Sequence, residues 1–495
     1  MASVSPAGGP RQALRFRFRG AEVALDRFSP RATLLDWLRE EARATGTKEG
    51  CGEGDCGACT VVLSRIREGK VTHEAVNACV LLLGQVDGAE VLTVEDLAEG
   101  TALHPIQQAM VDWHGSQCGF CTPGIVMSLF ALYHSGTPAT RAGVCDQLAG
   151  NLCRCTGYKP IIDAALATCD GAPADRFTRT NAERLQALGA LGDGADVFVG
   201  DEASFFAAPA SEKSLADLYL KHTDAVLVGG ATDVGLWITK QLRDPKKIIW
   251  LGRVAGLDRM EKSADGLTIY ATTSLERAMP ELGKLHPDIG EMMRRFGSAQ
   301  VRISGTLGGN VANGSPIGDS PPCLIALGAN VELRRGEASR TLPLENFFIA
   351  YGKQDRAPGE YVRAVFAPVL KSNQQYRAYK VTKRFDEDIS AVMSAFRFTL
   401  ERRRITEARI AYGGMAATPK RASGAEAALA GARLDDPNTW SRAIAAIATD
   451  FSPLTDMRAT AAYRSKVAAN LLRKALIEIA GAEAPTRVGA LDAAE

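Results

Sequence analysis

The stretch KEGCGEGDCGAC, residues 48–59, decides the fold of the N-terminal part of this chain. Its cysteines, Cys51, Cys56 and Cys59, are separated by four and then two residues, and Cys79 follows after nineteen more. Three closely spaced cysteines with a distant fourth have the plant-type ferredoxin spacing for a [2Fe–2S] cluster. A structural zinc site is the alternative, but zinc cysteines usually come as two separate C-x2-C pairs. We therefore predict that these four cysteines hold a [2Fe–2S] cluster.

The glycines of the same stretch suit a loop that wraps a cluster. Gly52, Gly54 and Gly57 alternate with the cysteines, and glycine adopts φ angles that other residues avoid. Such a loop can turn its backbone N–H groups toward the sulfur atoms, and these donors stabilise the reduced cluster and raise its potential. The residue types therefore favour iron over zinc.

A second cysteine set lies in two short motifs, QCGFC at 117–121 and NLCRC at 151–155. Its members are Cys118, Cys121, Cys153 and Cys155. Each motif lies between two expected helices, so one helical hairpin returns the chain to the same end of a bundle. The helix after Pro123 would point its positive dipole end at an anionic cluster. Spacing alone leaves a four-cysteine zinc site open, but the neighbouring ferredoxin-like set favours a second [2Fe–2S] cluster.

Length and composition indicate a multidomain globular chain. Its 495 residues exceed one ordinary core, so two to four domains are expected. The formal net charge of +1 gives no general attraction to nucleic acid or membranes, and no apolar run is long enough to span a bilayer. The start, MASVSPAGGPRQ, has no apolar signal core, so export is not expected. Clustered cysteines in a long chain without a signal favour metal binding in the cytoplasm over a disulfide framework.

Periodicity and composition divide the chain into five segments. We expect a β-rich domain at 12–98, a helical domain at 99–169, a linker at 170–200, an α/β domain at 201–372 and an α+β portion at 373–484. In the first segment, residues 14–25 predict a hairpin, residues 32–43 a helix, and residues 60–66 and 91–97 strands. Further strands are expected at 225–230, 246–251, 267–274, 390–400 and 405–414, and a long amphipathic helix at about 457–480.

Two glycine-rich stretches fall in the α/β segment. LVGGATDVGLW, 227–237, follows an expected strand but is not a G-x-G-x-x-G fingerprint, and a Gly-Gly pair after a strand is more often a turn. The second stretch, GTLGGNVANGSPIGDSPP at 305–322, offers several backbone amides in one irregular segment. Such a segment suits an anionic pyrophosphate.

The motifs KEGCGEGDCGACTV, QCGFCTPG and GNLCRCTGY, in that order, resemble the iron–sulfur region of the xanthine dehydrogenase and aldehyde oxidase family of molybdenum hydroxylases. Both glycine-rich stretches are similar to the flavin domain of the same family. The resemblance implies a multidomain α+β fold with a plant-type ferredoxin β-grasp domain and a four-helix [2Fe–2S] bundle. It also implies a two-part α/β FAD-binding domain of non-Rossmann type, with an α+β C-terminal domain.

The resemblance also implies a set of flavin contacts. These are Leu227, Val228, Gly229, Gly230, Ala231, Thr232, Asp233, Val234, Phe296, Thr306, Gly308, Gly309, Asn310, Asp319, Val362 and Lys380. Asn313 stands where relatives often have threonine, so the resemblance assigns it no definite role. In the loop KRFDEDIS, 383–390, Arg384 and Glu387 would lie near the flavin ring and tune its potential and the approach of NAD+. A solvated charged turn is an equally good interpretation of that loop.

The sequence shows no molybdopterin-binding region, so the family's hydroxylation chemistry, with its molybdenum cofactor, is expected on a partner chain and no catalytic residue is assigned here. The resemblance implies a small subunit in an assembly of two small and two large chains (α2β2). Electrons from purine oxidation would pass from molybdenum through the helical-domain cluster, the ferredoxin-like cluster and FAD to NAD+. The alternatives are a reductase subunit for an aldehyde or N-heterocycle hydroxylase, a free-standing diaphorase, and a zinc scaffold.

The remaining cysteines and the histidines near the second set receive no chemical role. Cys145, Cys169 and Cys323 lie outside both ligand patterns and are expected to be buried or inert thiols. The histidines are His104, His114 and His134. Histidine replaces two cysteines in Rieske centres, but both cysteine sets are already complete. Packing or surface positions are therefore expected for them.

Overall fold

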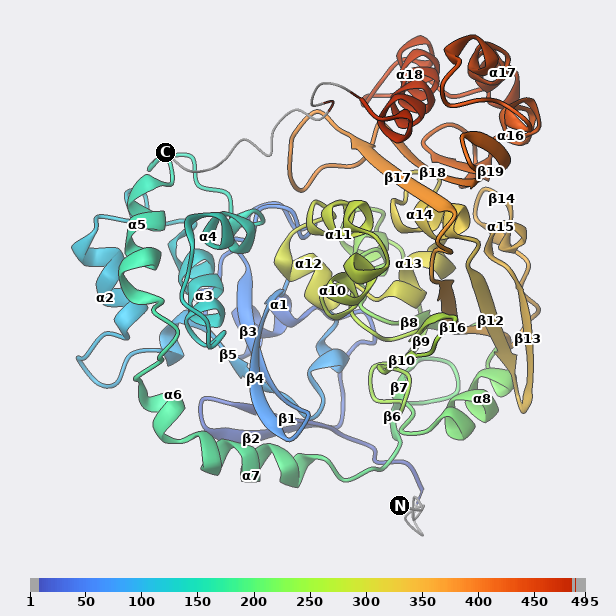
Figure 1. Cartoon of the computed structure of the whole chain (residues 1–495). Coiled ribbons are helices and arrows are strands. Elements are labelled where there is room, and N and C mark those ends of the chain that lie inside the picture. The colour runs from blue at the N-terminus through green and yellow to red at the C-terminus, as the bar shows by residue number, and fades with distance from the viewer. Residues whose placement is uncertain (1–8, 483–485, 487–495) are drawn as a thin grey trace. The chain divides into compact units, whose positions relative to one another are not determined.

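The computed structural model describes residues 9–482 and residue 486. It divides into two compact units (Figure 1): unit 1 is Met1–Gly256 with Gly297–Gly305, and unit 2 is Leu257–Phe296 with Thr306–Glu495. Residues 1–8, which belong to the start on which the expectation about export depends, and residues 483–484 of the last expected segment lie outside the described residues. Within the described ranges, no helix combines the length and apolar character needed to cross a membrane.

Unit 1 begins with a small mixed sheet of strand order β2-β1-β5-β3-β4. Its strands are β1 (Leu14–Phe18), β2 (Ala21–Leu25), β3 (Thr60–Arg67), β4 (Lys70–Asn77) and β5 (Glu90–Leu92). The predicted hairpin is confirmed, since β1 pairs antiparallel with β2. Leu14, Phe16 and Phe18 are buried and alternate with part-exposed arginines, as a half-buried strand requires. The parallel pairing of β1 with β5 completes the β-grasp arrangement.

The helix expected at 32–43 is shorter and irregular. Thr33 caps a turn, α1 (Leu34–Asp36), which continues as a π-helical turn, Trp37–Glu41. Trp37 packs edge-on against Phe16 and Phe18, with ring centroids 5.1 and 5.3 Å apart. Packing of this large ring against β1 therefore shapes the turn. The strand expected at 91–97 also ends early, at Leu92, and short 3-10 turns occupy Leu83–Val86 and Val94–Asp96.

The helical domain has the arrangement predicted from its motifs (Figure 1). Its helices are α2 (Pro105–Asp112), α3 (Thr122–Tyr133), α4 (Arg141–Leu148) and α5 (Lys159–Thr168). Helix α3 is buried along nearly its whole length. An apolar helix of this kind needs neighbours on all sides, and its core residues pack with those of α2, α4 and α5. The two cysteine motifs occupy the α2–α3 and α4–α5 connections.

The segment expected to be a linker, 170–200, contains regular structure. It holds helices α6 (Arg176–Arg179) and α7 (Asn181–Leu191) and strand β6 (Val197–Gly200). Strand β6 joins a sheet of order β6-β7-β9-β8. The other elements there are β7 (Phe205–Ala208), α8 (Glu212–Lys221), β8 (Val226–Val228), α9 (Val234–Thr239), β9 (Lys247–Trp250) and α12 (Ala299–Ser304). These helices were not predicted because the periodicity of the segment is weak. Other parts of unit 1 stabilise them.

Unit 2 opens with an antiparallel sheet of order β10-β11-β16-β12-β13. Its strands are β10 (Met260–Lys262), β11 (Gly266–Tyr270), β12 (Asn330–Arg335), β13 (Ala338–Pro343) and β16 (Tyr361–Pro368). The accompanying elements are α10 (Leu275–Leu285), α11 (Pro287–Arg294), α13 (Leu307–Asn313), α14 (Ser320–Leu327), α15 (Leu344–Phe347), β14 (Phe348–Ala350) and β15 (Lys353–Gln354). The helices α10, α11, α13 and α14 share one buried core with the sheet.

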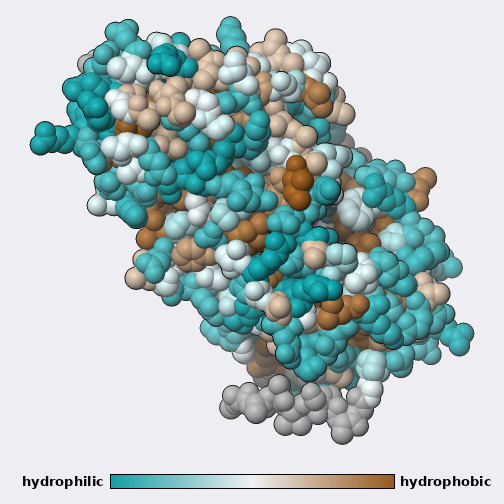
Figure 2. All heavy atoms as spheres, turned by 90° about the vertical axis from the view of Figure 1, so that its right-hand side faces the viewer, coloured by the Kyte–Doolittle hydropathy of each residue, from teal (hydrophilic) through white to brown (hydrophobic). Residues whose placement is uncertain are grey.

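The last part of unit 2 is an antiparallel sheet of order β17-β18-β19-β20 covered by helices. Its elements are β17 (Gln374–Val381), β18 (Val392–Glu401), β19 (Arg404–Gly413), β20 (Lys420–Arg421), α16 (Ser423–Leu429), the 3-10 turn Pro437–Trp440, α17 (Ser441–Asp450) and α18 (Ala461–Ala480). The predicted strands and the long helix agree with β18, β19 and α18. On the face shown in Figure 2, hydrophobic residues lie in separate spots among hydrophilic ones.

Candidate functional site

The first cysteine set converges in unit 1 between the start of β3 and the end of β4. The thiol of Cys51 lies close enough to those of Cys56 and Cys79, and Cys59 to Cys79, for these groups to shift one another's pKa values. The neighbouring thiols of Cys56 and Cys79 lower the pKa of Cys51. The backbone N–H groups of Glu53 and Cys56 also donate to its sulfur, each at 3.4 Å. Four thiols with amide donors aimed at sulfur are a donor set that fits a [2Fe–2S] cluster.

Gly57 occupies the tightest position of this cluster loop. Its φ is +68°, in the left-handed region that favours glycine. A Cβ atom there would lie 2.1 Å from the carbonyl oxygen of Gly150 and 2.5 Å from the side-chain nitrogen of Asn151. The loop therefore needs glycine for its own turn and for the close approach of the segment before Cys153.

The second cysteine set converges at one end of the helical domain. Cys118 lies beside Cys155, and Cys121 beside Cys153, close enough for these thiols to shift each other's pKa values. Burial and the neighbouring thiol of Cys153 raise the pKa of Cys121 to about 12. Cys118 and Cys155 are exposed, whereas Cys153 is buried. Helix α3 begins directly after Cys121, so its positive end faces this quartet and would stabilise an anionic cluster.

A buried polar junction joins the two cluster loops. The Leu152 amide donates to the carbonyl of Cys56 at 2.9 Å, and Asn151 donates to the carbonyl of Gly57 at 3.1 Å. The oxygen of Asn151 accepts from Ser128 at 2.5 Å and from Gln300 at 2.6 Å. All three polar side chains are buried, and buried polar groups persist when they are hydrogen-bonded. The sequence motifs did not predict this junction, although Asn151 belongs to the second of them.

The first glycine-rich stretch forms the turn between β8 and α9 in unit 1. The carbonyl of Gly229 accepts from Gln85 at 3.3 Å and from the indole of Trp250 at 3.1 Å. A Cβ on Gly230 would lie 1.8 Å from the backbone oxygen of Ser304. Ala231 has φ +62°, a strained conformation for alanine that is typical of ligand-binding loops. Leu227 and Val228 end β8, Thr232 and Asp233 lie in the turn, and Val234 begins α9.

The second glycine-rich stretch lies in unit 2 around α13. Thr306 caps this helix by accepting from the Gly309 amide at 3.0 Å, and a Cβ on Gly308 would lie 2.5 Å from Ala271 Cα. Asn310 accepts a hydrogen bond from Ser320 at 2.6 Å. Of the other predicted contacts in unit 2, Val362 is buried in β16 and Phe296 packs against the core.

Asp319 and Lys380 form a buried ion pair in unit 2. Their charged atoms are 2.6 Å apart, and the two side chains are 5% and 2% exposed. Ser390 donates to the carboxylate at 2.6 Å and accepts from the ammonium at 3.1 Å. A buried pair with this third partner satisfies both charges. The resemblance predicted both charged residues as flavin contacts, and the structure brings them together.

The KRFDEDIS loop is a hydrogen-bonded turn rather than an open run of charges. Asp388 accepts from the amides of Lys383 and Arg384, each at 3.0 Å, and Arg384 donates to the carbonyl of Glu387 at 2.9 Å. Glu387 has φ +52°. The guanidinium of Arg295 lies 4.5 Å from the Phe385 ring centroid. The turn is therefore locally ordered, and its role beside a flavin stays a prediction.

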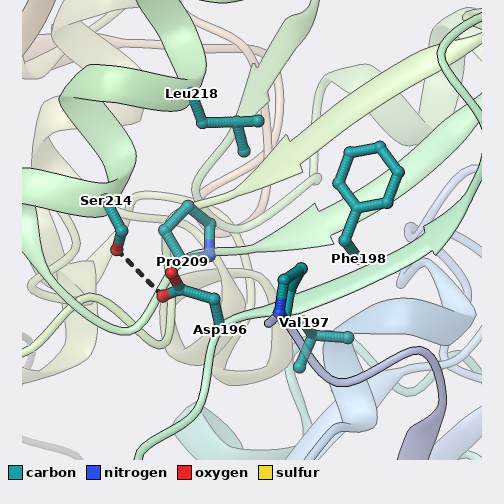
Figure 3. Close-up of a pocket in the computed structure, with 7 residues that line it drawn as sticks. Asp196, Val197, Phe198, Pro209, Ser214 and Leu218 are labelled. Atoms are coloured by element: carbon teal, nitrogen blue, oxygen red, sulfur yellow. Dashed lines mark hydrogen bonds between the residues drawn. The ribbon is translucent and has the colours of Figure 1, made fainter. Parts of the chain in front are cut away.

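The residues that line a small cavity in unit 1 include none of the predicted site residues (Figure 3). Its volume is 90 Å³, and its lining is Pro10, Asp196, Val197, Phe198, Pro209, Ser214 and Leu218. Ser214 donates to Asp196 at 2.9 Å, as Figure 3 shows, and the Ala210 amide donates to the same carboxylate oxygen at 2.7 Å. Ligand pockets usually measure about 300–1,000 Å³. This cavity is a structural gap beside α8.

The remaining cysteines and histidines mostly follow expectation. Cys169 and Cys323 are buried, but Cys145 is exposed, because it lies on the outer side of α4. His104 and His134 both bond to the same oxygen of the buried Asp175, at 2.7 and 2.9 Å. The Nδ1 atom of His104 accepts from the Ile106 amide, so its proton lies on Nε2 and the ring donates to the carboxylate. These hydrogen bonds hold the three side chains together, with their ligand atoms within 4.8 Å of one another.

Comparison with known proteins adds matches over most of the chain. Four family profiles match: the "FAD binding domain in molybdopterin dehydrogenase" over residues 202–370, the "CO dehydrogenase flavoprotein C-terminal domain" over 377–479, a "[2Fe-2S] binding domain" over 93–166 and a "2Fe-2S iron-sulfur cluster binding domain" over 19–83. They confirm the predicted fold class and the iron–sulfur and FAD-binding domains.

Two curated relatives illustrate the similarity. Xanthine dehydrogenase of Emericella nidulans is 32% identical over 498 residues, which covers 89% of this chain and 36% of the relative. Xanthine dehydrogenase/oxidase of Rattus norvegicus is 30% identical and covers 81% of this chain and 34% of the relative. The chain thus spans about a third of the length of the curated relatives it matches.

Solved structures are similar over about half of the chain. Reconstituted CO dehydrogenase from Oligotropha carboxidovorans matches with a TM-score of 0.52 and 28% identity, covering 56% of this chain and 97% of the matched one. Quinoline 2-oxidoreductase from Pseudomonas putida 86 has a TM-score of 0.50 and 22% identity over 55% of this chain and 95% of the other. The latter likeness is one of fold alone.

Proposed function

Because its domains are those of an iron–sulfur and flavin subunit of the molybdenum hydroxylase family, we propose that this chain is the electron-transfer subunit of a xanthine dehydrogenase. A partner subunit with the molybdenum cofactor oxidises hypoxanthine and xanthine, and two chains of each kind form the assembly. Electrons pass through both clusters and FAD to NAD+ in the cytoplasm, where reducing conditions keep the ligand cysteines available.

The observation that carries the proposal is the pair of complete thiol quartets joined by one buried junction. Each cysteine of the two sets lies close enough to another member of its own set for the two thiols to shift each other's pKa values. The Cys56 carbonyl and the Leu152 amide connect the two loops directly. Two one-electron centres held by one rigid piece of protein are suited to a relay. Zinc would not need this junction, since a structural zinc site works alone.

The flavin stretches supply the other requirement of the proposal. Each cluster carries one electron, whereas FAD takes up electrons singly and gives up a hydride to NAD+. The flavin therefore belongs between the clusters and NAD+. On this chain, Gln85 and Trp250 hold the Gly229 carbonyl, and Asp319 and Lys380 hold each other in unit 2. The role proposed for these residues is to bind and orient the cofactor.

Xanthine as the substrate of the assembly rests on the extent of similarity. The xanthine dehydrogenase of Emericella nidulans matches 89% of this chain, whereas the CO dehydrogenase chain matches 56%. This chain carries iron–sulfur and flavin domains together, and the xanthine enzyme therefore matches a larger share of it than the CO dehydrogenase chain does. The second candidate, a reductase subunit for an aldehyde or N-heterocycle hydroxylase, is favoured by the fold of the quinoline enzyme.

The test is to purify the native complex through a tag on this chain and assay it. We expect about four irons and one FAD per chain, a co-purifying molybdenum-containing subunit, and urate formation from xanthine with NAD+ as acceptor. A Cys153→Ser variant is the matched control, because it should keep the flavin and the first cluster but lose NADH formation from xanthine.

Each alternative gives a different result. Turnover of an aldehyde or quinoline in place of xanthine would select the second candidate. Full NADH-oxidising activity without any molybdenum subunit would indicate a free-standing diaphorase. Colourless protein that contains zinc would refute the relay altogether.

A further inference from the structure

Helix α9 links the first glycine-rich stretch to the ferredoxin-like cluster loop within unit 1. The helix begins at Val234, within that stretch. A Cβ on Gly235 would lie 2.6 Å from the Val80 carbonyl oxygen, so α9 rests closely on the residue after Cys79. Leu236 packs against the core beneath the cluster loop. The position of α9 is therefore fixed against this loop.

The C-terminal end of α9 places an ammonium group on a ligand cysteine. Lys240 donates its side chain to the backbone carbonyl of Cys51. A Cβ on Gly52 would lie 3.7 Å from the same ammonium nitrogen, and the Glu53 carboxylate is 3.8 Å from it. Lys240 thus lies over the stretch from Cys51 to Glu53, in which Cys51 is part-exposed.

The charge balance of the loop makes this cation important. Residues 48–59 contain three carboxylates and one lysine, so the loop itself opposes the arrival of an electron. Reduction makes the anionic cluster more negative, and a cation within a few ångströms favours the reduced form. Lys240 supplies this charge from outside the loop, on the helix that follows the proposed flavin stretch.

We propose that Lys240 is a positioning residue that raises the reduction potential of the cluster on Cys51, Cys56, Cys59 and Cys79 and so favours electron arrival on the cluster beside α9. The inference rests on the proposed function, since it assumes that the cluster is present. It assigns Lys240 no part in cluster assembly, because the side chain is 44% exposed and bonds to a backbone carbonyl.

The test is an anaerobic redox titration of the native complex, followed by electron paramagnetic resonance of the reduced clusters. Lys240→Met should lower one of the two cluster midpoints by a tenfold change in the reduction equilibrium, which is about 59 mV for one electron. Lys240→Arg keeps the charge and should stay within about twofold of the parent. Glu53→Gln should shift the same midpoint in the opposite direction.

Lys221→Met is the matched control. Lys221 is 63% exposed, pairs with Glu202 on unit 1, and its removal changes the net charge of the chain equally. We expect no shift in either midpoint. Raising the ionic strength should shrink the Lys240→Met shift, because salt screens a half-exposed charge, whereas a change of loop shape would persist.

Unchanged midpoints in Lys240→Met, or an equal shift in Lys240→Arg, would overturn the inference. Loss of iron from Lys240→Met would also overturn it, because Lys240 would then hold the loop rather than tune the cluster. A parent complex without two cluster signals would refute the proposed function as well, so the two failures are distinguishable.

Discussion

Replacing Gly57 with alanine tests the junction between the two cluster loops. Gly57 has φ +68°, and the new methyl group would lie 2.1 Å from the Gly150 carbonyl oxygen. That atom belongs to the backbone, so no side-chain rotation relieves the overlap. The two loops must move apart, and both cluster sites are expected to be disturbed.

The size of the effect follows from three contributions. A left-handed φ costs a non-glycine residue about 1–2 kcal/mol. Separation of the loops also weakens the bonds from Leu152 to Cys56 and from Asn151 to Gly57, each contributing about 1 kcal/mol. We therefore expect Gly57→Ala to lose about 3–4 kcal/mol of unfolding free energy.

Gly69→Ala is the matched control, because Gly69 has φ +75° and a methyl group added there would meet no atom within 4 Å apart from its chain neighbours. It should lose only the backbone contribution of about 1–2 kcal/mol. Urea unfolding measures the difference, provided that both variants keep the slope of the parent. Iron content and the resonance signals of both clusters provide the second readout.

If the two variants lost the same unfolding free energy, the reasoning would be refuted, because the close approach at Gly57 would then contribute nothing to stability. The same conclusion would follow if Gly57→Ala kept both cluster signals unchanged. If only the first cluster were lost, the claim that the junction couples the two cluster sites would be contradicted. The need for glycine in the first cluster loop would still stand.

Three further predictions concern other groups. Lys380→Met leaves the Asp319 carboxylate buried without its cation and should lower the unfolding free energy by about 3–5 kcal/mol. The variant should also lose bound FAD, and unchanged flavin absorbance would contradict the predicted contact. Adding Asp319→Leu should restore part of the stability. Burial raises the pKa of the Asp175 carboxyl, but hydrogen bonds from His104 and His134 outweigh burial and lower this pKa. A lowered carboxyl pKa stabilises the fold above its unfolded value of about 3.9 and loses that contribution as pH falls. Asp175→Asn should therefore be less stable than the parent at neutral pH, by about 1.5–3 kcal/mol, with a gap that closes in acid; a constant gap in urea unfolding would be the contrary result. Glu387→Lys should change the rate of NAD+ reduction in stopped-flow assays without altering cluster reduction, and identical NAD+ kinetics would dismiss a role beside the flavin.

Local signals predicted much of the fold. The alternation of Leu14, Phe16 and Phe18 predicted the first hairpin, since burial of one face of a strand appears directly as a period of two. The helices on either side of the motif QCGFC were expected, and proline, which the first helical turn tolerates, lies in the first turn of both of them in the structure. The expected helix at 32–43 was cut short because Trp37 packs against β1.

The sequence by itself determined which residues are suited to bind clusters, because the spacing of the cysteines and the glycines beside them are those of [2Fe–2S] sites. It also determined the order of the domains. Only the tertiary structure decided how the two loops meet through Asn151, that 170–200 folds into helices, and that Lys240 reaches Cys51. These contacts join residues about 90 to 190 positions apart, and they form only where packing of the core brings distant segments together.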